Sequence, residues 1–382
     1  MPCTALLRKI DELHAQYLNV LEDLCNLESP TADKARVDAV GSYIACWGRE
    51  HGFEVEVQPM EGAGDPLCIT MNPTAAAAPV VLSGHIDTVH PVGLFPTPAV
   101  RRDETNMYGP GVVDCKGGVV ASMLAMDALQ QCGFTARPVK LVIQTDEETS
   151  SINSGKRTIE FMVERSKGAA AFLNTEGCVE HKAVIERKGI ARFRLNVHGK
   201  AAHSASCYEG VNAVAEAAHK ILKLEAFKDP LGITCNCGVI QGGTVANTVA
   251  ETCSFLADFR YATAEQYEQL MQTLNEVAEH STLPGATCTI EPVSSRPQMQ
   301  RCERNLNLLE RMNAIYAENG LPALTGNPSR GGSDASYTTI AGIPTVDSVG
   351  VDGRRIHAID EYMFLDSLAD SAKRLAAVAW SL

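Results

Sequence analysis

The chain has little basic charge for its length. Its 382 residues include 33 Lys and Arg against 46 Asp and Glu, a formal net charge of −13. Binding to nucleic acid or to an anionic membrane needs clustered Lys and Arg, so this balance argues against both kinds of partner. An acidic small-molecule substrate stays compatible with it, because a pocket can be locally basic.

Long hydrophobic runs are also missing. No segment approaches the roughly 20 apolar residues that span a bilayer. The N-terminal segment carries acidic residues where a signal peptide would be apolar, and its apolar residues recur at helical spacing. We therefore expect a cytoplasmic protein.

The cysteines lack the spacing of a disulfide framework. There are 13 of them, an odd number, scattered over strand-like and helix-like segments. In a reducing compartment we expect most to be small buried apolar residues. Cys235 and Cys237 stand close together, but no second Cys/His pair lies nearby, which disfavours a structural zinc there.

Strand-like and helix-like segments alternate along much of the chain. Residues 139–144 form a short, continuously apolar run, typical of a strand covered on both faces. Residues 116–131 are rich in Ala, Met and Leu and indicate a helix. Such alternation predicts an α/β fold, with a mixed sheet flanked by helices.

The pattern changes near Glu186 and resumes near residue 303. The intervening segment predicts an α+β insertion large enough for its own core. We therefore predict a discontinuous catalytic domain, residues 1–187 and 298–382, interrupted by an inserted domain of residues 188–297. The elements expected in the insertion are strands 191–198, 233–241, 251–261 and 286–292 and helices 211–227 and 264–282.

Acidic and histidine residues follow several of the predicted strands directly. His85, Glu147 and Glu176 each come just after a buried strand. In open α/β sheets, ligands gather outside the carboxyl ends of the strands, so these residues should converge.

The residues around the first of these histidines suit a metal site. His85 and Asp87 lie at i and i+2, so the aspartate can orient the imidazole while the other ring nitrogen binds metal. Asp114 lies among glycines and has two oxygens that could bridge two cations. Read alone, the pair His85 and Asp87 is more typical of a polar loop after a strand, and Asp114 is equally typical of a helix N-cap.

The adjacent pair Glu147 and Glu148 is the sharper signal. Two carboxylates at the end of a buried strand repel each other and lose hydration, a cost that needs compensation. We interpret Glu148 as a metal ligand and Glu147 as the general base. A metal pair beside an uncoordinated Glu activates water, which predicts a metal-dependent amide hydrolase.

Several blocks carry a family resemblance: SGHIDTV, GPGVVDCKGG, TDEETS, NTEG and SRGGSDAS, with a late His357. They resemble the dizinc exopeptidases and deacylases, the branch that holds carboxypeptidase G, acetylornithine deacetylase, succinyl-diaminopimelate desuccinylase and aminoacylase. The resemblance extends from about Leu24 to the C-terminus. It implies a catalytic domain with two Zn²⁺ per chain, for which Co²⁺ or Mn²⁺ could substitute, and an inserted lid domain that mediates homodimerisation.

The resemblance also implies roles for individual residues. The Asp114–Cys115 peptide bond is expected to be cis. Position by position, one zinc would be bound by His85 and Glu176 and the other by Glu148 and His357, with Asp114 bridging, Glu147 as base and Asp87 orienting His85.

The inserted domain matches the family as well. His203 corresponds to a histidine that crosses from the partner subunit to stabilise the oxyanion. Asn247 and Arg260 match substrate-binding residues, and Arg260 would pair with the free carboxylate of the substrate. Arg330 stands two positions from where carboxypeptidase G has its second substrate arginine. Gly177 replaces a proline that is frequent in the family, and the loop after His203 is shorter than usual.

The expected activity is release of a C-terminal amino acid, with glutamate as one candidate, from a peptide or N-acyl conjugate. An N-acyl-amino-acid deacylase uses the same metal chemistry and stays open as an alternative. A catalytically silent relative that acts as a binding protein is the alternative from another class.

Overall fold

The computed structural model describes residues 3–229 and 232–382, and the chain divides into two units. The first unit holds the residues up to Ile185, Arg301–Pro328 and Tyr337–Leu382, and the second holds Glu186–Gln300 and Ser329–Ser336. The short segment Ser329–Ser336 therefore belongs to the second unit, whereas the sequence predicted it to be part of the catalytic domain. The Arg187 guanidinium holds it there, since Nη1 donates to Ser329 Oγ and to the Gly331 carbonyl, both at 3.2 Å.

The first unit is built on a six-stranded mixed sheet with the order β1-β2-β6-β3-β7-β14. Strands β6, β3, β7 and β14 run parallel to one another, while β2 pairs antiparallel with β6 and β1 antiparallel with β2. The strand bounds are β1 Glu54–Val57, β2 Leu67–Met71, β3 Val80–His85, β6 Val139–Gln144, β7 Ala171–Asn174 and β14 Thr345–Val346.

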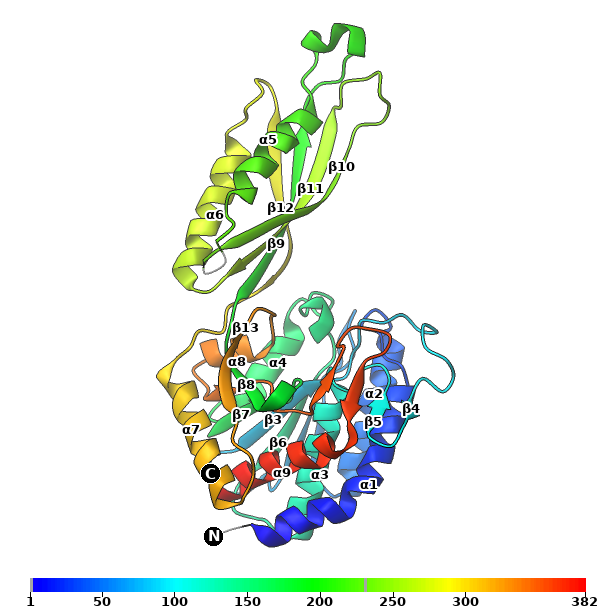
Figure 1. Cartoon of the computed structure of the whole chain (residues 1–382), viewed down its shortest axis with the longest axis vertical. Coiled ribbons are helices and arrows are strands. Elements are labelled where there is room, and N and C mark those ends of the chain that lie inside the picture. Colours follow the sequence, from blue (N-terminus) through cyan, green and yellow to red (C-terminus); the bar gives the residue numbers. More distant parts are fainter. Residues whose placement is uncertain (1–2, 230–231) are drawn as a thin grey trace. The chain divides into compact units, whose positions relative to one another are not determined.

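Helices cover both faces of this sheet (Figure 1). Neighbouring strand residues point to opposite faces. Accordingly, Leu82 belongs to the core formed with α1, α2, α3 and α9, whereas Val81 packs with residues of α4. The predicted α/β architecture is confirmed. The helix bounds are α1 Thr4–Asn26, α2 Lys34–Glu50, α3 Lys116–Gln131, α4 Arg157–Ser166, α7 Glu303–Glu318, α8 Ala335–Ile340 and α9 Leu365–Ser381.

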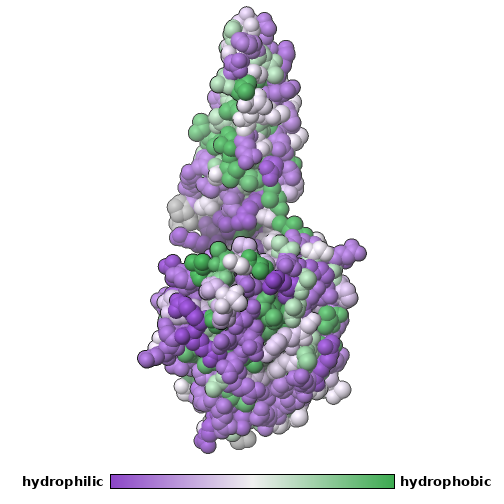
Figure 2. Space-filling view, turned by 90° about the vertical axis from the view of Figure 1, so that its right-hand side faces the viewer, coloured by the Kyte–Doolittle hydropathy of each residue, from purple (hydrophilic) through white to green (hydrophobic). Residues whose placement is uncertain are grey.

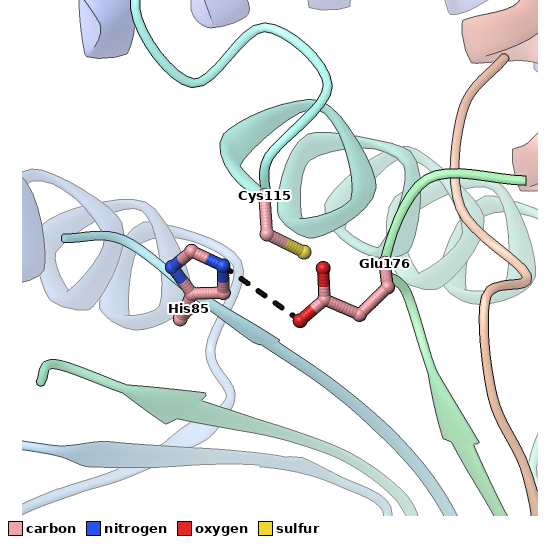
Figure 3. Close-up of side chains that lie close together, drawn as sticks. All are labelled: His85, Cys115 and Glu176. Carbon is pink, nitrogen blue, oxygen red and sulfur yellow. Dashed lines mark ion pairs between the residues drawn. The ribbon is translucent and has the colours of Figure 1, made fainter. Parts of the chain in front are cut away.

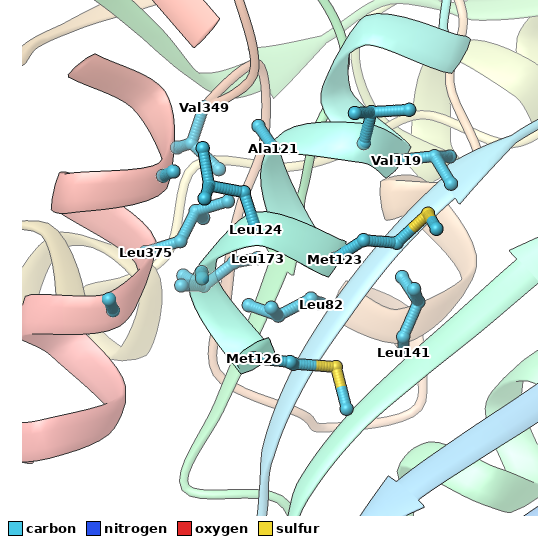
Figure 4. Packing of buried hydrophobic residues seen from close by; sticks show 14 of the residues in the cluster. Leu82, Val119, Ala121, Met123, Leu124, Met126, Leu141, Leu173, Val349 and Leu375 are labelled. Atoms are coloured by element: carbon cyan, nitrogen blue, oxygen red, sulfur yellow. The ribbon is translucent and has the colours of Figure 1, made fainter. Parts of the chain in front are cut away.

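Helix α3 is the centre of the core. Residues 116–129 of it are all buried. Figure 4 shows Met123 beside the sheet residues Leu82 and Leu141, while Leu124 faces Leu375 of α9. A helix covered on all sides in this way fixes the loop that precedes it, which carries Asp114.

A smaller sheet of the first unit has the order β15-β16-β5-β4 and brings the late part of the chain beside residues near 106. A separate ladder joins β8 to β13. The bounds are β4 Arg101–Arg102, β5 Asn106–Tyr108, β8 Lys182–Arg187, β13 Thr325–Ser329, β15 Gly353–Arg354 and β16 Tyr362–Phe364.

The second unit is an antiparallel sheet with the order β10-β11-β9-β12, packed against two helices (Figure 1). Strand β11 alternates between buried and partly exposed residues, as expected for a sheet with one covered face. Its apolar core is separate from that of the first unit. The bounds are β9 Gly189–His198, α5 Ala213–Glu225, β10 Thr234–Gly242, β11 Thr252–Tyr261, α6 Ala264–Glu279 and β12 Thr287–Arg296.

Some apolar side chains of the second unit reach its surface (Figure 2). Val239 and Ile240 of edge strand β10 are 48% and 49% exposed, and Val245 just beyond it is 58% exposed. Across residues 3–229 and 232–382, none of the helices has the length and apolar character required to cross a membrane.

Candidate metal centre

Three neighbouring parallel strands deliver acidic and histidine side chains to one edge of the large sheet. His85 is the last residue of β3. Glu147 and Glu148 begin a short 3₁₀ turn, Glu147–Thr149, after β6, and Glu176 follows β7. Because β3 pairs in parallel with both β6 and β7, the three strand ends are adjacent. The convergence expected from the sequence is present.

Asp114 lies between two histidines. Its Oδ1 is 2.9 Å from Nε2 of His85, and its Oδ2 is 2.9 Å from Nε2 of His357. His357 comes from the loop after β15 and has a φ of +66°, a backbone conformation that residues other than glycine rarely adopt. The Asp114–Cys115 peptide bond is cis, as the family resemblance implied. Each oxygen of Asp114 thus faces a different histidine, which is the arrangement that a bridging ligand requires.

Asp87 lies behind the first histidine and is fully buried. Nδ1 of His85 lies 3.0 Å from the backbone oxygen of Asp87 and 3.3 Å from its Oδ1. Both are acceptors, so Nδ1 carries a proton. Burial alone would lower the pKa of His85, but its hydrogen bonds to Asp114 and Asp87 raise it, so without a cation Nε2 is protonated as well and donates to Asp114 Oδ1. Loss of that second proton to a cation would leave the lone pair on Nε2. Thr31 Oγ donates to Asp87 Oδ2 at 2.8 Å and holds the carboxylate in place. Asp87 therefore fixes the tautomer that leaves Nε2 able to bind a cation.

Two further carboxylates complete the cluster. Oε2 of Glu148 lies 3.2 Å from Nε2 of His357, and Oε1 of Glu176 lies 3.7 Å from Nε2 of His85. Figure 3 shows the thiol of Cys115 directed toward the space between His85 and Glu176. That thiol donates to the Thr175 carbonyl at 3.1 Å, and burial raises its pKa well above the usual range. Cys115 is therefore held as a neutral thiol.

The carboxylates of the cluster outnumber its two histidines, so the positive charge of the histidines cannot balance all of the negative charge. Burial, together with the nearby Asp114 carboxylate, raises the pKa of Glu148 to about 7 and that of Glu176 well above its usual range. Burial opposes the ionised form of Asp114 too, but hydrogen bonds from His357 and His85 hold its pKa low. The hydrogen bonds of His357 to Asp114 and to Glu148 raise its own pKa to about 10.

The residues fit divalent cations. Five carboxylates, those of Asp87, Asp114, Glu147, Glu148 and Glu176, share this edge of the sheet with two histidines. Ligand atoms of His85, Asp114 and Glu148 all lie within 4.8 Å of one another. Imidazole nitrogen and carboxylate oxygen are the donors that zinc takes in catalytic sites. Bound cations would offset the electrostatic cost that the raised carboxylate pKa values record.

Glu361 is a buried site residue that the sequence analysis does not identify. Its Oε1 accepts the backbone N–H groups of Val113 at 2.8 Å and of Asp114 at 3.1 Å. Burial raises its pKa to about 8. Glu361 lies in the polar stretch IDEY, and nothing in that stretch predicts that its carboxylate accepts backbone N–H groups about 250 residues earlier in the chain.

The residues expected to contact the substrate lie in the second unit. His203 is exposed, and its Nδ1 accepts the N–H of Ala205 at 3.1 Å. The backbone carbonyl of Asn247 accepts the N–H of Ser204 at 2.9 Å. Within this unit, His203 and Asn247 therefore lie on neighbouring segments, although they are far apart in the sequence.

The two arginines have different surroundings. Arg260 lies on β11 and donates from Nε to Oδ1 of Asp258 at 2.8 Å. Its side chain is 28% exposed, so it is neither buried nor simply a solvated strand residue. Arg330 lies in the turn after β13 and is exposed.

Comparisons with known proteins agree with this architecture. A family model described as Peptidase family M20/M25/M40 matches residues 81–381. Carboxypeptidase G2 from Pseudomonas sp. (strain RS-16) is 28% identical over 378 residues, covering 95% of this chain and 90% of that protein. The solved aminopeptidase PepT from Bacillus cereus ATCC 10987 superposes with a TM-score of 0.77 at 21% identity, covering 96% of this chain and 97% of its own. The M20 family metallo-carboxypeptidase Sso-CP2 from Sulfolobus solfataricus gives a TM-score of 0.75 at 17% identity, with 95% and 98% covered.

Proposed function

The chain belongs to peptidase family M20/M25/M40, and on that basis we propose that it is a zinc-dependent exopeptidase of the carboxypeptidase type. It would hydrolyse an amide bond and release a C-terminal amino acid, such as glutamate, from a peptide or an N-acyl conjugate. The likeness to carboxypeptidase G2 along 95% of the chain supports this reaction. The observation that carries it is the cluster of carboxylates and histidines at the edge of the sheet, with the adjacent acids Glu147 and Glu148.

Two cations fit the two sides of Asp114. His85 and Glu176 would hold one, Glu148 and His357 would hold the other, and Asp114 would contribute an oxygen to each. Bound divalent cations supply a water of lowered pKa and polarise the scissile carbonyl.

Glu147 is the proposed general base and acid. Glu148, its neighbour, is engaged with His357, and Glu147 is the second buried carboxylate of the pair. In this role Glu147 takes the proton of the attacking water and returns it to the leaving amine. The backbone N–H of Glu147 donates to Asp87 Oδ1 at 3.2 Å, which fixes the position of its main chain.

His203 is the proposed donor to the oxyanion. Because its Nδ1 accepts the Ala205 N–H, the proton of the neutral ring lies on Nε2. An N–H at Nε2 is the group that stabilises the negative oxygen of a tetrahedral intermediate.

Arg260 is the proposed partner of the substrate's free carboxylate, with Asn247 and Arg330 as further substrate contacts. The planar guanidinium can bind two oxygens at once. Asp258 already accepts from Arg260 and also from Arg192 Nε at 2.5 Å. Asp258 therefore shares its charge between two arginines, which leaves part of the guanidinium fork of Arg260 for a second carboxylate.

We propose further that two copies associate through the second unit. Strand β10 is an edge strand of its sheet, and edge strands with exposed apolar residues favour pairing with another chain. Val239 and Ile240 give β10 that character. A cytoplasmic location is also proposed, since all 13 cysteines are free thiols, as expected in a reducing compartment.

Amino-acid release from a panel of N-acyl and dipeptide substrates, with zinc and then with a chelator, tests the proposal. Chelator-sensitive release from C-terminal glutamyl substrates would support the carboxypeptidase reaction. Release only from acetyl or succinyl conjugates would assign the enzyme to the deacylases instead. A chain that holds its metal but hydrolyses none of them would favour the silent binding protein.

A further inference from the structure

Two thiols and a carboxylate meet in the second unit. Sγ of Cys235 lies 3.9 Å from Sγ of Cys237. A carboxylate oxygen of Glu225 lies within 4.8 Å of both sulfurs. We propose that Glu225, Cys235 and Cys237 bind one thiophilic divalent cation such as Zn²⁺, separate from those of the candidate metal centre.

The backbone explains why these three side chains converge. Glu225 is the last residue of α5, and both cysteines lie on β10. The register of β10 against β11 shifts between Asn236 and Val239, so the strand bulges within residues 237–238. A bulge re-aims the side chain at that point and bends the strand. Cys235 and Cys237 stand two positions apart, so both side chains point to the same face of the sheet, the face that packs against α5.

The sulfur separation is compatible with a bound cation and is too long for a disulfide. Zinc takes Zn–S distances near 2.3 Å in tetrahedral geometry, which places two sulfurs about 3.8 Å apart. The observed 3.9 Å is close to that value. A disulfide would need the sulfurs at roughly 2.0 Å.

The carboxylate of Glu225 is held in place by two donors. The backbone N–H of Cys237 donates to its Oε1 at 2.6 Å, and Lys228 forms an ion pair with its Oε2. Such outer contacts orient a ligand and set its affinity. Two thiolates and one carboxylate carry three negative charges, which a divalent cation and Lys228 together would balance.

The thiolate is the form of cysteine that binds metal, so a bound cation would displace the thiol protons. Cys235 is buried, whereas Cys237 and Glu225 are partly exposed, so a cation can enter and a fourth position can hold water.

This inference revises the expectation drawn from the sequence. The pair Cys235–Cys237 argued against zinc because no second Cys/His pair lies nearby. The structure supplies a third ligand of another type, Glu225, from the helix that precedes the strand.

Cobalt binding to the full chain tests the proposal. The protein is reduced, stripped of metal with a chelator and titrated with Co²⁺, and absorption from thiolate-to-cobalt charge transfer is recorded. We expect this band in the unmodified protein and its loss in the double variant Cys235→Ser/Cys237→Ser, together with one fewer bound metal per chain. Cys115→Ser is the matched control, because Cys115 lies beside His85 and Glu176. This control should keep the band.

Glu225→Gln provides a test that leaves both thiols in place. We expect its affinity for Cd²⁺ at this site to fall by about tenfold or more, since a charged ligand is lost. Bound Cd²⁺ should protect Cys237 from an alkylating reagent. The Cd²⁺ concentration needed for this protection would measure the affinity even if the double serine variant failed to fold. A missing cobalt band, or one that survives in the double variant, would overturn the proposal. Isolation of the chain without added reductant as a metal-free species with a Cys235–Cys237 disulfide would overturn it in favour of a redox pair.

Discussion

Asp87 holds Glu148 through its backbone: Oδ2 of Asp87 accepts the Glu148 N–H at 3.1 Å. Oδ1 of the same carboxylate accepts the N–H of Glu147 and lies 3.3 Å from Nδ1 of His85. A single buried side chain therefore positions a proposed zinc ligand on β3 and the turn that carries both acids after β6. A displacement of the Asp87 side chain would therefore disturb both His85 and the turn that carries Glu147 and Glu148.

Asp87→Ala should weaken metal binding by about 10–100-fold, because His85 loses its orienting partner and two buried N–H groups lose their acceptor. Asp87→Asn keeps one acceptor oxygen and should lose less. Isothermal titration with Zn²⁺ measures both, and the exposed Asp370→Asn variant controls for charge. Unchanged affinity in Asp87→Ala would show that Asp87 does not position the site.

Glu147→Gln should lower kcat by at least about 10²-fold, because the amide cannot accept the proton of water. Metal content, measured by elemental mass spectrometry, should stay at the level of the unmodified protein. Glu160→Gln, an exposed change on α4, is the control and should retain activity. Loss of bound metal in Glu147→Gln would mean that the roles of Glu147 and Glu148 are reversed.

Glu361→Ala should lower the free energy of unfolding by about 1–3 kcal/mol, because the buried N–H groups of Val113 and Asp114 lose their acceptor. Glu361→Gln retains an acceptor oxygen, so its effect should be smaller. Urea denaturation followed by circular dichroism compares the two. Equal losses of unfolding free energy in both variants would indicate that the size or charge of Glu361, and not its acceptor oxygen, stabilises the fold.

The parts of the site that could be predicted from sequence are those fixed by local pattern. The bounds expected for 116–131 and 139–144 coincide with α3 and β6, because apolar side chains at these positions decide burial locally. His85, Glu147 and Glu176 follow buried strands, and the rule that ligands gather at the carboxyl ends of strands was enough to bring them together.

Residues placed by tertiary contacts could not be predicted in this way. Glu361 meets Val113 only because β16 pairs with β5, a contact between segments far apart in the chain. Ser329–Ser336 groups with the second unit through contacts such as the ion pair of Asp334 with Arg296, at 3.6 Å. Helix α2 is a different case, since Val37, Val40 and Ile44 recur at helical spacing and do carry a local signal for it.

The second unit should lose stability in acid through Glu216. Its buried carboxylate accepts the N–H groups of Leu283 at 2.7 Å and Thr282 at 3.0 Å and contacts Lys220 at 3.2 Å. Burial favours protonation, but these donors hold the pKa of Glu216 below its ordinary value. Its contribution is therefore complete above the unfolded pKa of about 4.3 and is lost as the pH falls through the lower folded value.

Hydrogen exchange of residues 186–300 between pH 7 and pH 3 measures this loss. Glu216→Gln should be less protected at pH 7 and should change less with pH than the unmodified chain. Glu279→Gln, an exposed change on α6, should follow the unmodified chain throughout. Parallel acid profiles for Glu216→Gln and the unmodified chain would rule out Glu216 as the titrating group.

His203→Ala should lower kcat by about 10²–10³-fold with little change in metal content, since an oxyanion donor is lost while the proposed metal ligands lie in the other unit. His198→Ala, an exposed change at the end of β9, is the control and should remain active. A rise in KM with unchanged kcat would instead place His203 in substrate binding.

Mixing the two inactive variants, Glu147→Gln and His203→Ala, tests whether His203 acts across a dimer. If each active site takes Glu147 from one chain and His203 from its partner, a mixed dimer contains one site with both residues intact. After subunit exchange at equal concentrations, about a quarter of all sites should then be active, because half of the dimers are mixed. If both residues of a site came from the same chain, each site in a mixed dimer would still lack one of them. The mixture would then stay as inactive as its components, and the proposed crossing would be wrong.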